Sequence, residues 1–542
     1  MIKRDDFNGI ARAGGCIMVV SNRLRTWTTG CGCCHTTRRG FLTGCAGCAV
    51  TASALLEPKL TWAAPRSGGR SKVRVVFCQP KNDRPTWPNV GYDFEARERQ
   101  IMQALTAGCP EVQFLPARMI DTSAEESGLL DRHAEVDGYI VCLLGLGWEY
   151  GFEPLCASGK PTLLVDNLYG GSGMFLTRTG RVMETGNPVD WLSTSRDEDL
   201  VAAARHFALL AAGRSPAEVA AAFRATRRQR CPEVTDWTCE DDNVSIADFK
   251  EALQKLQQTR LLVIGGGWGG DEFRQAAKNV TGVEFVPIAF EELAAAYEVA
   301  DQEAAQDFAD RWMEESQEVV EPTKEDIYGS GAMYVAMQAL MSKHRAAGIS
   351  INCLGGFYGG HLKAYPCLGF SHLNNEGQVG GCEADQMSAL TMSVMGALAG
   401  RPGFISDPVI DTSKNQIIYA HCVAMTKPFG VDGPANPYRI RNHSEDRKGA
   451  SIQSLLPPGY MTTTLEINPV TRQVLMHQAK TAGNNYSDMA CRTKLEAYVR
   501  GDIEKLTENW RMGWHRVTFY GDLRETVVEL SERWKLELIE EA

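Results

Sequence analysis

The sequence predicts an α/β protein in which two Rossmann-like parallel-sheet domains are followed by a mainly β C-terminal domain. From Lys72 onward, apolar runs of strand length alternate with longer segments of helical periodicity, a pattern typical of parallel sheets covered by helices. After Asp407 the pattern changes to short strands separated by turns rich in Gly and Pro. The length of 542 residues also excludes a single compact core.

The first α/β domain is expected over residues 67–255. Strands and one helix are predicted from apolar runs and from helical periodicity. The strands are Lys72–Cys78, Val112–Pro116, Gly138–Leu144 and Pro161–Val165, and the helix is Asp93–Ala107. Ala-rich sequence from about Asp197 to Gln257 is predicted to be helical.

The second α/β domain is expected over residues 256–402. It is predicted to open with a strand ending at Gly265 and to close with a helix whose apolar residues fall close to one face. The predicted elements are strands Arg260–Gly265 and Gly348–Cys353 and helices Ala304–Glu318, Lys324–His344 and Gln386–Leu398.

The C-terminal domain is expected over residues 403–542 and is mainly β. Its strands are bounded by two turns rich in Gly and Pro, Pro428–Pro437 and Leu456–Tyr460. The predicted strands are Gln416–Met425, Met461–Ile467, Gln473–Gln478 and Leu495–Val499.

Residues 1–66 differ from the rest of the chain in charge and in cysteine content. They carry nine Lys or Arg residues against three acids, a net charge of +6, so residues 67–542 carry −17 of the total of −11. This acidic body argues against a nucleic-acid partner. Six of the 17 cysteines lie in the first 48 residues, and the other eleven are scattered singly, mostly in apolar runs. We expect those eleven to be buried thiols of a protein that folds in a reducing compartment.

The order of features in residues 1–66 resembles a twin-arginine export signal. Arg38 and Arg39 precede an apolar stretch, Phe41–Leu56, which is too short and too weakly hydrophobic for a stable membrane span. Small residues around Ala63 follow, as a signal peptidase requires. The resemblance implies the twin-arginine translocation machinery as a partner and a periplasmic or extracellular location. A disordered basic tail is the alternative.

A glycine-rich loop offers one candidate site. Gly265–Gly270 satisfies G-x-G-x-x-G directly after a predicted strand, which is the pattern of a dinucleotide-binding turn. The expected acid at the end of the next strand is missing, because Glu284 lies inside that strand, and Trp268 occupies the turn. The loop therefore predicts either an exported NAD(P)-dependent sugar oxidoreductase or a plain strand-to-helix turn.

Acidic and imidazole side chains offer a second candidate site. Glu383 and Asp385 come just before a predicted helix, Asp407 ends an apolar run, and His515 begins another. Two carboxylates and one imidazole suit a divalent cation, and hard oxygen ligands favour Mn2+ or Mg2+ over Zn2+. The alternatives are that Glu383 caps the helix and that His515 is a core histidine.

Several of these motifs resemble the L-fucose/L-arabinose isomerase family. The motifs are Gly377 through Gly-Gly-Cys-Glu-Ala-Asp385, the following Leu-Ala-Gly-Arg-Pro-Gly and Phe-Ile-Ser-Asp407, Ala420-His421-Cys422, and Gly513-Trp-His-Arg-Val-Thr-Phe-Tyr520. The resemblance is clearest from Leu368 to Ala542 and implies a fucose isomerase-like fold. It also implies that Mn2+ is held by Glu383, Asp407 and His515, with His421 matching a further histidine of the arabinose branch.

The reaction that the resemblance implies is aldose-ketose isomerisation through an ene-diol. Glu383 and Asp407 would move a proton between C1 and C2 of a fucose- or arabinose-like sugar. Because the chain is shorter than typical fucose isomerases and carries an export-like segment, the sugar stays unassigned. A catalytically silent sugar-binding protein with the same fold is a further alternative.

His421 and four further residues are candidate substrate-binding residues, with a core histidine as the alternative for His421. Arg84 and Trp87 lie in the loop after the first strand, and in the family a loop of this kind contributes an arginine to the site, often at a subunit interface. Arg511 and Trp514 qualify by their nearness to His515. A surface role is the alternative for each of these four. The resemblance further implies a homo-oligomer, a trimer or hexamer, with sites at subunit interfaces.

Overall fold

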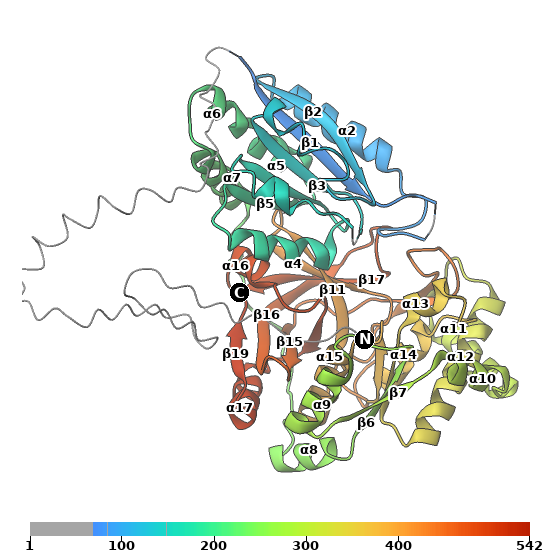
Figure 1. Cartoon of the computed structure of the whole chain (residues 1–542). Helices are drawn as coiled ribbons and strands as arrows, with labels where there is room; N and C mark the ends of the chain where they lie inside the picture. The colour runs from blue at the N-terminus through green and yellow to red at the C-terminus, as the bar shows by residue number, and fades with distance from the viewer. Residues whose placement is uncertain (1–68, 84, 148) are drawn as a thin grey trace, which may run out of the picture. The chain divides into compact units, whose positions relative to one another are not determined.

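A computed structural model of the chain describes residues 69–83, 85–147 and 149–542 (Figure 1). The export-like segment and Arg84 lie outside these described residues. The described residues form one compact unit. The expected domain boundaries at residues 255 and 402 stay predictions.

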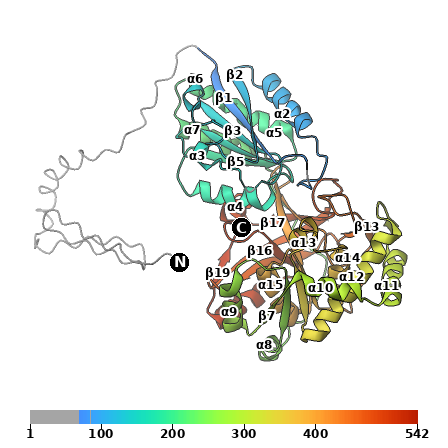
Figure 2. The ribbon, with the colours of Figure 1, turned by 45° about the vertical axis from the view of Figure 1, so that its right-hand side comes forward.

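The first sheet contains five parallel strands in the order β2-β1-β3-β4-β5. The strands are β1 (Ser71–Gln79), β2 (Val112–Ile120), β3 (Gly138–Leu143), β4 (Thr162–Asn167) and β5 (Val189–Thr194). The helices are α2 (Phe94–Gly108), η2 (His133–Glu135), α3 (Glu153–Cys156), α4 (Ser172–Met183), α5 (Asp197–Ala204), η3 (Arg205–Phe207), α6 (Ala208–Ala211) and α7 (Pro216–Arg230). Helices α2, α5 and α7 cover one face of the sheet and α4 covers the other (Figure 2). Burial on both faces explains the continuous apolar strands that the sequence shows.

The predicted helix from Asp197 to Gln257 is wrong in its middle. Helix α7 ends at Arg230, and no helix or strand is assigned until α8 (Phe249–Leu256). Cys231 adopts extended dihedral angles because a following proline, here Pro232, disfavours the helical conformation. The intervening segment runs along the C-terminal domain, where the Glu240 amide donates to the Gly459 carbonyl at 2.8 Å.

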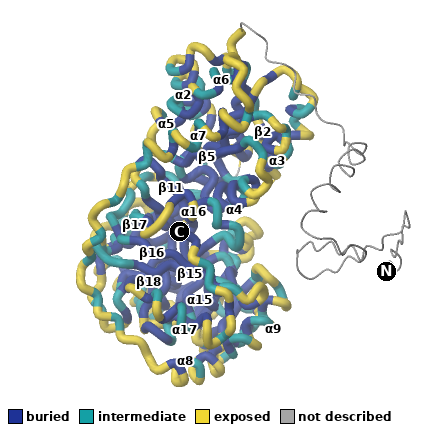
Figure 3. Tube along the Cα trace, turned by 90° about the vertical axis from the view of Figure 1, so that its left-hand side faces the viewer, coloured by how far each residue is buried: buried dark blue, intermediate teal, exposed yellow. Residues whose placement is uncertain are grey.

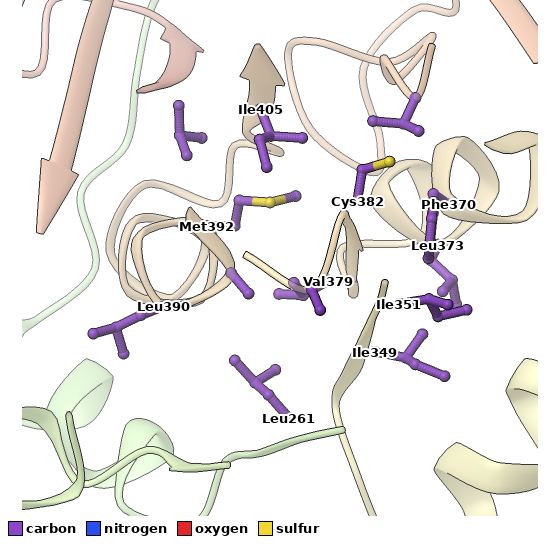
Figure 4. Packing of buried hydrophobic residues seen from close by; sticks show 14 of the residues in the cluster. Leu261, Ile349, Ile351, Phe370, Leu373, Val379, Cys382, Leu390, Met392 and Ile405 are labelled. Atoms are coloured by element: carbon purple, nitrogen blue, oxygen red, sulfur yellow. The ribbon is translucent and has the colours of Figure 1, made fainter. Parts of the chain in front are cut away.

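The second sheet contains four parallel strands in the order β10-β9-β6-β7. They are β6 (Arg260–Ile264), β7 (Glu284–Ile288), β9 (Gly348–Ile351) and β10 (Val379–Cys382). The helices are α9 (Gly270–Thr281), α10 (Phe290–Glu298), α11 (Gln302–Glu315), α12 (Lys324–His344), α13 (Cys353–Tyr358), α14 (Cys367–Asn375) and α15 (Gln386–Ala399). Figure 4 shows Leu261 and Val379 on the side of the sheet toward Leu390 and Met392 of α15, whereas Ile349 lies on the side toward Leu373 of α14. This core fixes α15, whose N-terminus adjoins the candidate site.

The C-terminal domain is an antiparallel barrel. Six strands pair in the order β15-β18-β11-β12-β17-β16, and β16 pairs with β15 to close the ring, while β19 adds to β16 in parallel. They are β11 (Phe404–Asp411), β12 (Gln416–His421), β15 (Met461–Asn468), β16 (Gln473–Asn484), β17 (Thr493–Arg500), β18 (Arg516–Tyr520) and β19 (Glu537–Glu540). A small sheet, β8 (Glu318–Val319), β13 (Tyr438–Arg441) and β14 (Ser451–Ser454), and helices α16 (Ile503–Asn509) and α17 (Arg524–Trp534) complete the domain's surroundings. Closure leaves the ring without free edges, and its strands are largely buried (Figure 3).

The fold class predicted from the sequence is confirmed: two parallel-sheet α/β domains precede a mainly β C-terminal region. Nine of the eleven described cysteines are buried, and all eleven are free thiols, as expected. Among the described residues, none of the helices is both long enough and apolar enough to span a bilayer.

Candidate active site

Glu383 lies on a strained turn between β10 and α15. Glu383 and Ala384 have positive φ angles of 59° and 50°, a left-handed conformation that costs non-glycine residues about 1–2 kcal/mol each. Asp385 ends the turn and caps α15, since its carboxylate accepts from the backbone amides of Met387 and Ser388. The turn therefore holds Glu383 at the carboxyl end of a parallel strand, where α/β proteins place their sites.

The glycine-rich loop packs against this turn. A Cβ atom on Gly267 would lie 2.8 Å from the Ala384 carbonyl oxygen and 2.9 Å from Gln386 Nε2, too close for any side chain. Gln386 Nε2 in turn donates to the Trp268 carbonyl at 2.7 Å. At Gly267 the glycine is thus needed for a close backbone approach to the Glu383 turn. This packing favours the structural interpretation of the loop over the dinucleotide-binding one.

The barrel contributes three further side chains to the same place. Asp407 belongs to β11, His421 ends β12, and His515 immediately precedes β18. Neighbouring strands carry them, because β11 pairs with both β12 and β18. All three are buried, whereas the Glu383 side chain is 27% exposed. Glu383 is therefore the member of the set that a ligand from solvent can reach most directly.

The ligand-type atoms of this set converge. His515 Nε2 lies 3.8 Å from Glu383 Oε2 and 3.5 Å from Asp407 Oδ1. His421 Nε2 lies 3.8 Å from Glu383 Oε1. Ligand atoms that share one cation at about 2.0–2.6 Å lie about 3–5 Å from one another, so these separations fit a shared ion. The structure thus brings Glu383, Asp407, His515 and His421 together.

Two partners orient the converging groups. Asp385 Oδ2 lies 2.9 Å from His515 Nδ1, on the side of the ring opposite the site. Trp514 Nε1 donates to Asp407 Oδ1 at 2.7 Å. Carboxylates that hold the second nitrogen of a histidine are a common feature of metal sites. The sequence placed Asp385 beside Glu383, but no local pattern indicates that it meets His515.

The donor set fits a divalent cation. The Nε2 atoms of His421 and His515 are both buried and have no hydrogen-bond partner among the described residues, so each can interact with a bound ion or substrate. Carboxylate oxygens with imidazole nitrogen suit Mn2+ or Mg2+. Cys382 also lies within ligand reach, since its sulfur is within 4.8 Å of ligand atoms of Glu383 and His421. Cys353 Sγ is 3.2 Å from Cys382 Sγ.

The pKa values of Glu383 and Asp407 shift in opposite directions. Burial raises the pKa of Glu383 well above its usual value, with His515 opposing and Asp407 adding to the shift. Burial also acts to raise the pKa of Asp407, but His515 outweighs it and the pKa falls. Burial lowers the pKa of His421 to about 4, so this ring is neutral near pH 7. Opposite shifts in neighbouring acids are a recurring feature of acid-base sites.

The other predicted substrate-binding residues are placed differently. Trp87 is buried, and its indole N–H donates to the Tyr169 carbonyl, which is a packing contact. Arg511 is partly exposed and pairs with Glu184 at the end of α4. Trp514 touches Asp407, as described above. Arg84 lies outside the described residues.

The loop after β1 reaches a segment that sequence reasoning missed. The backbone amide of Val90 donates to the Glu445 carbonyl at 2.8 Å, and the Glu445 carboxylate accepts from Tyr358 at 2.8 Å. Burial is the main cause of the raised pKa of Glu383, and Glu445 adds to that shift. The loop after β1 and Glu445 therefore meet within one chain, without a second subunit. Glu445 belongs to no motif, so its approach to this loop could not be predicted from the sequence.

Comparison with known proteins gives distant relatives. No family model matches the chain. Proteins named sulfoquinovose isomerase are 32% identical over 91 residues in Alkalicoccus urumqiensis, 25% over 179 in Clostridium sp. (strain MSTE9) and 24% over 194 in Priestia aryabhattai. These matches cover 16%, 32% and 35% of this chain and 20%, 39% and 43% of the relatives. The chain therefore matches less than half the length of each relative, and this distant similarity supports a sugar isomerase family.

Proposed function

We propose that this protein is a divalent-metal-dependent aldose-ketose isomerase of sugars. The observation that carries the proposal is the convergence of Glu383 and Asp407 on His515 Nε2, at 3.8 and 3.5 Å. These three residues would hold Mn2+, or Mg2+ in its place. The distant relatives named sulfoquinovose isomerase support the same reaction class.

The reaction moves one proton from C2 to C1 of the sugar and a second from the C2 hydroxyl to O1, through an ene-diol. A bound Mn2+ would supply polarisation of the carbonyl and stabilise negative charge on the sugar oxygens. Glu383 and Asp407 would transfer the proton between the two carbons, one accepting as the other donates. Trp514 donates its indole N–H to Asp407 Oδ1 and so holds that carboxylate in place.

We propose a free sugar as substrate. L-fucose and L-arabinose follow from the sequence resemblance, and sulfoquinovose is the sugar in the relatives' name. The test is to incubate purified protein with Mn2+ and each sugar and to follow ketose formation by NMR. In D2O, exchange of the C2 hydrogen would report proton transfer even where equilibrium favours the aldose.

Glu383→Gln is the matched control for this assay, because it keeps size and removes the charge. It should abolish both isomerisation and Mn2+ binding, since it removes one of three anionic or imidazole ligands. Isomerisation that persists in this variant would overturn the assignment of Glu383. Turnover of a sugar only with added NAD(P) would instead favour the oxidoreductase alternative at Gly265–Gly270.

We also propose export through the twin-arginine route and assembly into a homo-oligomer. Support for export is the order Arg38-Arg39, apolar stretch and small residues in residues 1–66. A reporter fused to these residues should be exported, and replacement of both arginines by lysine should stop it. Light scattering after size-exclusion chromatography measures the oligomeric state, expected to be a trimer or hexamer.

A further inference from the structure

The two histidines of the site differ in what their Nδ1 atoms meet. His515 Nδ1 faces the carboxylate of Asp385 at 2.9 Å. That carboxylate accepts from two backbone amides and from the Ser388 hydroxyl, so it acts as an acceptor toward His515 as well. In the neutral ring, the form that can ligate a metal ion, the hydrogen of His515 is therefore on Nδ1. Its Nε2 carries a lone pair toward Glu383 and Asp407, as a metal ligand requires.

His421 has the opposite arrangement. Its Nδ1 accepts a hydrogen bond from the backbone N–H of Cys422 at 3.0 Å. A backbone amide nitrogen can only donate, so Nδ1 of His421 must offer its lone pair. In the neutral ring the hydrogen is then on Nε2. That atom is buried, has no hydrogen-bond partner among the described residues, and faces Glu383 Oε1 at 3.8 Å.

A nitrogen that carries a hydrogen cannot also ligate a cation. We propose that His515 is a metal ligand whereas His421 is not, and that His421 donates its Nε2 hydrogen to an oxygen of the bound sugar. The metal ion and the sugar acceptor both rest on the proposed function; the positions of the hydrogens on the two neutral rings do not. A neutral donor held by the main chain beside Glu383 would stabilise negative charge that develops on the sugar oxygen during proton transfer.

The backbone bond also gives the donor a fixed direction. His421 is the last residue of β12, and its partner Cys422 is the next residue, so the ring and the amide move together. The His421 and His515 rings lie 5.4 Å apart, centre to centre, and are tilted by 58°. The two Nε2 atoms therefore face one site from different segments of the barrel. His421 Nε2 is the donor, and His515 Nε2 is the acceptor.

The decisive measurement is the number of imidazole nitrogens bound to Mn2+ in the full-length protein. Pulsed EPR of the protein loaded with Mn2+ alone should show one directly bound imidazole. That signal should persist in His421→Gln and vanish in His515→Gln. Two bound imidazoles in the unaltered protein would overturn the inference, and this result needs no variant to fold.

Affinity and turnover give an independent readout. Gln offers an N–H near the position of Nε2, whereas Leu offers none. His421→Gln and His421→Leu should both keep the Mn2+ dissociation constant within about threefold. His421→Leu should lower kcat/KM by about 100-fold, and His421→Gln should restore part of it. A loss of Mn2+ affinity above tenfold in both variants would show that His421 is a ligand.

Failure of the proposed function would look different. If the unaltered protein binds no Mn2+, or if His515→Gln binds it unchanged, the metal set itself is wrong. If one imidazole binds but no sugar is isomerised, the division of the histidines stands and the activity does not. If two imidazoles bind and a sugar is isomerised, the activity stands and the inference about His421 is wrong.

Discussion

Asp385 and His515 lie 130 positions apart in the sequence and meet in a hydrogen bond of 2.9 Å between Oδ2 and Nδ1. The same carboxylate caps α15 through its other oxygen. One residue thus joins the turn that carries Glu383 to the barrel segment that carries a second ligand.

Replacing Asp385 by Asn should separate its two roles. Asn caps a helix about as well as Asp, but its amide cannot accept the Nδ1 hydrogen of His515 with the strength of a carboxylate. Loss of such an outer partner typically lowers metal affinity 10–100-fold, and we expect that range for Mn2+. Titration with the EPR signal of free Mn2+ measures it. An unchanged dissociation constant would show that the contact with His515 is not needed for binding.

Gly267 approaches the Ala384 carbonyl so closely that a methyl group there is expected to lower Mn2+ affinity, whereas one at Gly266 is not. Gly267→Ala should push the Ala384 carbonyl away, costing about 1–3 kcal/mol of stability and lowering Mn2+ affinity. Gly266→Ala is the control: nothing lies within 4 Å of its Cβ, but its φ of +83° makes it strained. The control should lose about 1 kcal/mol and keep its Mn2+ affinity. Equal losses of affinity in both variants would contradict the packing argument.

Trp514 predicts an effect on turnover. Trp514→Phe removes the N–H that Asp407 Oδ1 accepts at 2.7 Å, and a hydrogen bond to a charged group contributes about 1.5–3 kcal/mol. We expect kcat/KM to fall about 10- to 100-fold while the protein stays folded by circular dichroism. Trp237→Phe removes a comparable N–H, bonded to the Val234 carbonyl, and should leave turnover unchanged. A similar loss in both variants would indicate a general effect of tryptophan removal.

Lys494 predicts a stability that depends on pH. Burial lowers the pKa of Lys494 from 10.5 to about 8, so between these pH values the unfolded chain binds a proton that the folded chain does not. The resulting penalty is complete below pH 8 and disappears as the pH rises toward 10.5. It amounts to about 3 kcal/mol.

The free energy of unfolding of Lys494→Met, measured relative to that of the unaltered protein, should therefore be about 3 kcal/mol higher at pH 7.5 than at pH 10.5. Urea unfolding of both proteins at the two pH values measures this difference in unfolding free energy. The contributions of other titrating groups largely cancel, because both proteins contain them. A difference that does not change with pH would mean that Lys494 titrates normally.

The sequence was informative where local chemistry decides the structure. Helix α12 has the predicted bounds, Lys324–His344, because Thr323 and Asp326 form a capping box at its start. Strand β10 was missed because Gly380 and Gly381 are poor strand formers. Gly380 is needed there, since a Cβ would lie 2.5 Å from the Phe370 carbonyl, and such a tertiary contact leaves no local pattern.

In the site, too, residue types could be predicted from the sequence, whereas tertiary contacts could not. Glu383, Asp407 and His515 could be singled out by residue type and motif, and the structure brings them together. The contacts that give each group its role could not. Asp385, which meets His515, follows a left-handed turn at Glu383 and Ala384, a conformation that non-glycine residues rarely adopt. The Cys422 amide reaches His421 only because β12 ends at that residue.

Glu383 follows the edge strand β10 of a parallel sheet, whereas Asp407 lies in a barrel strand and His515 immediately precedes one. A cation held by all three residues would cross-link the second parallel sheet to the barrel. By mass action, a free ion concentration 100 times the dissociation constant would add about 2.7 kcal/mol to the free energy of unfolding. The melting temperature would then report how much of the protein is loaded, and local opening of either layer would release the ion.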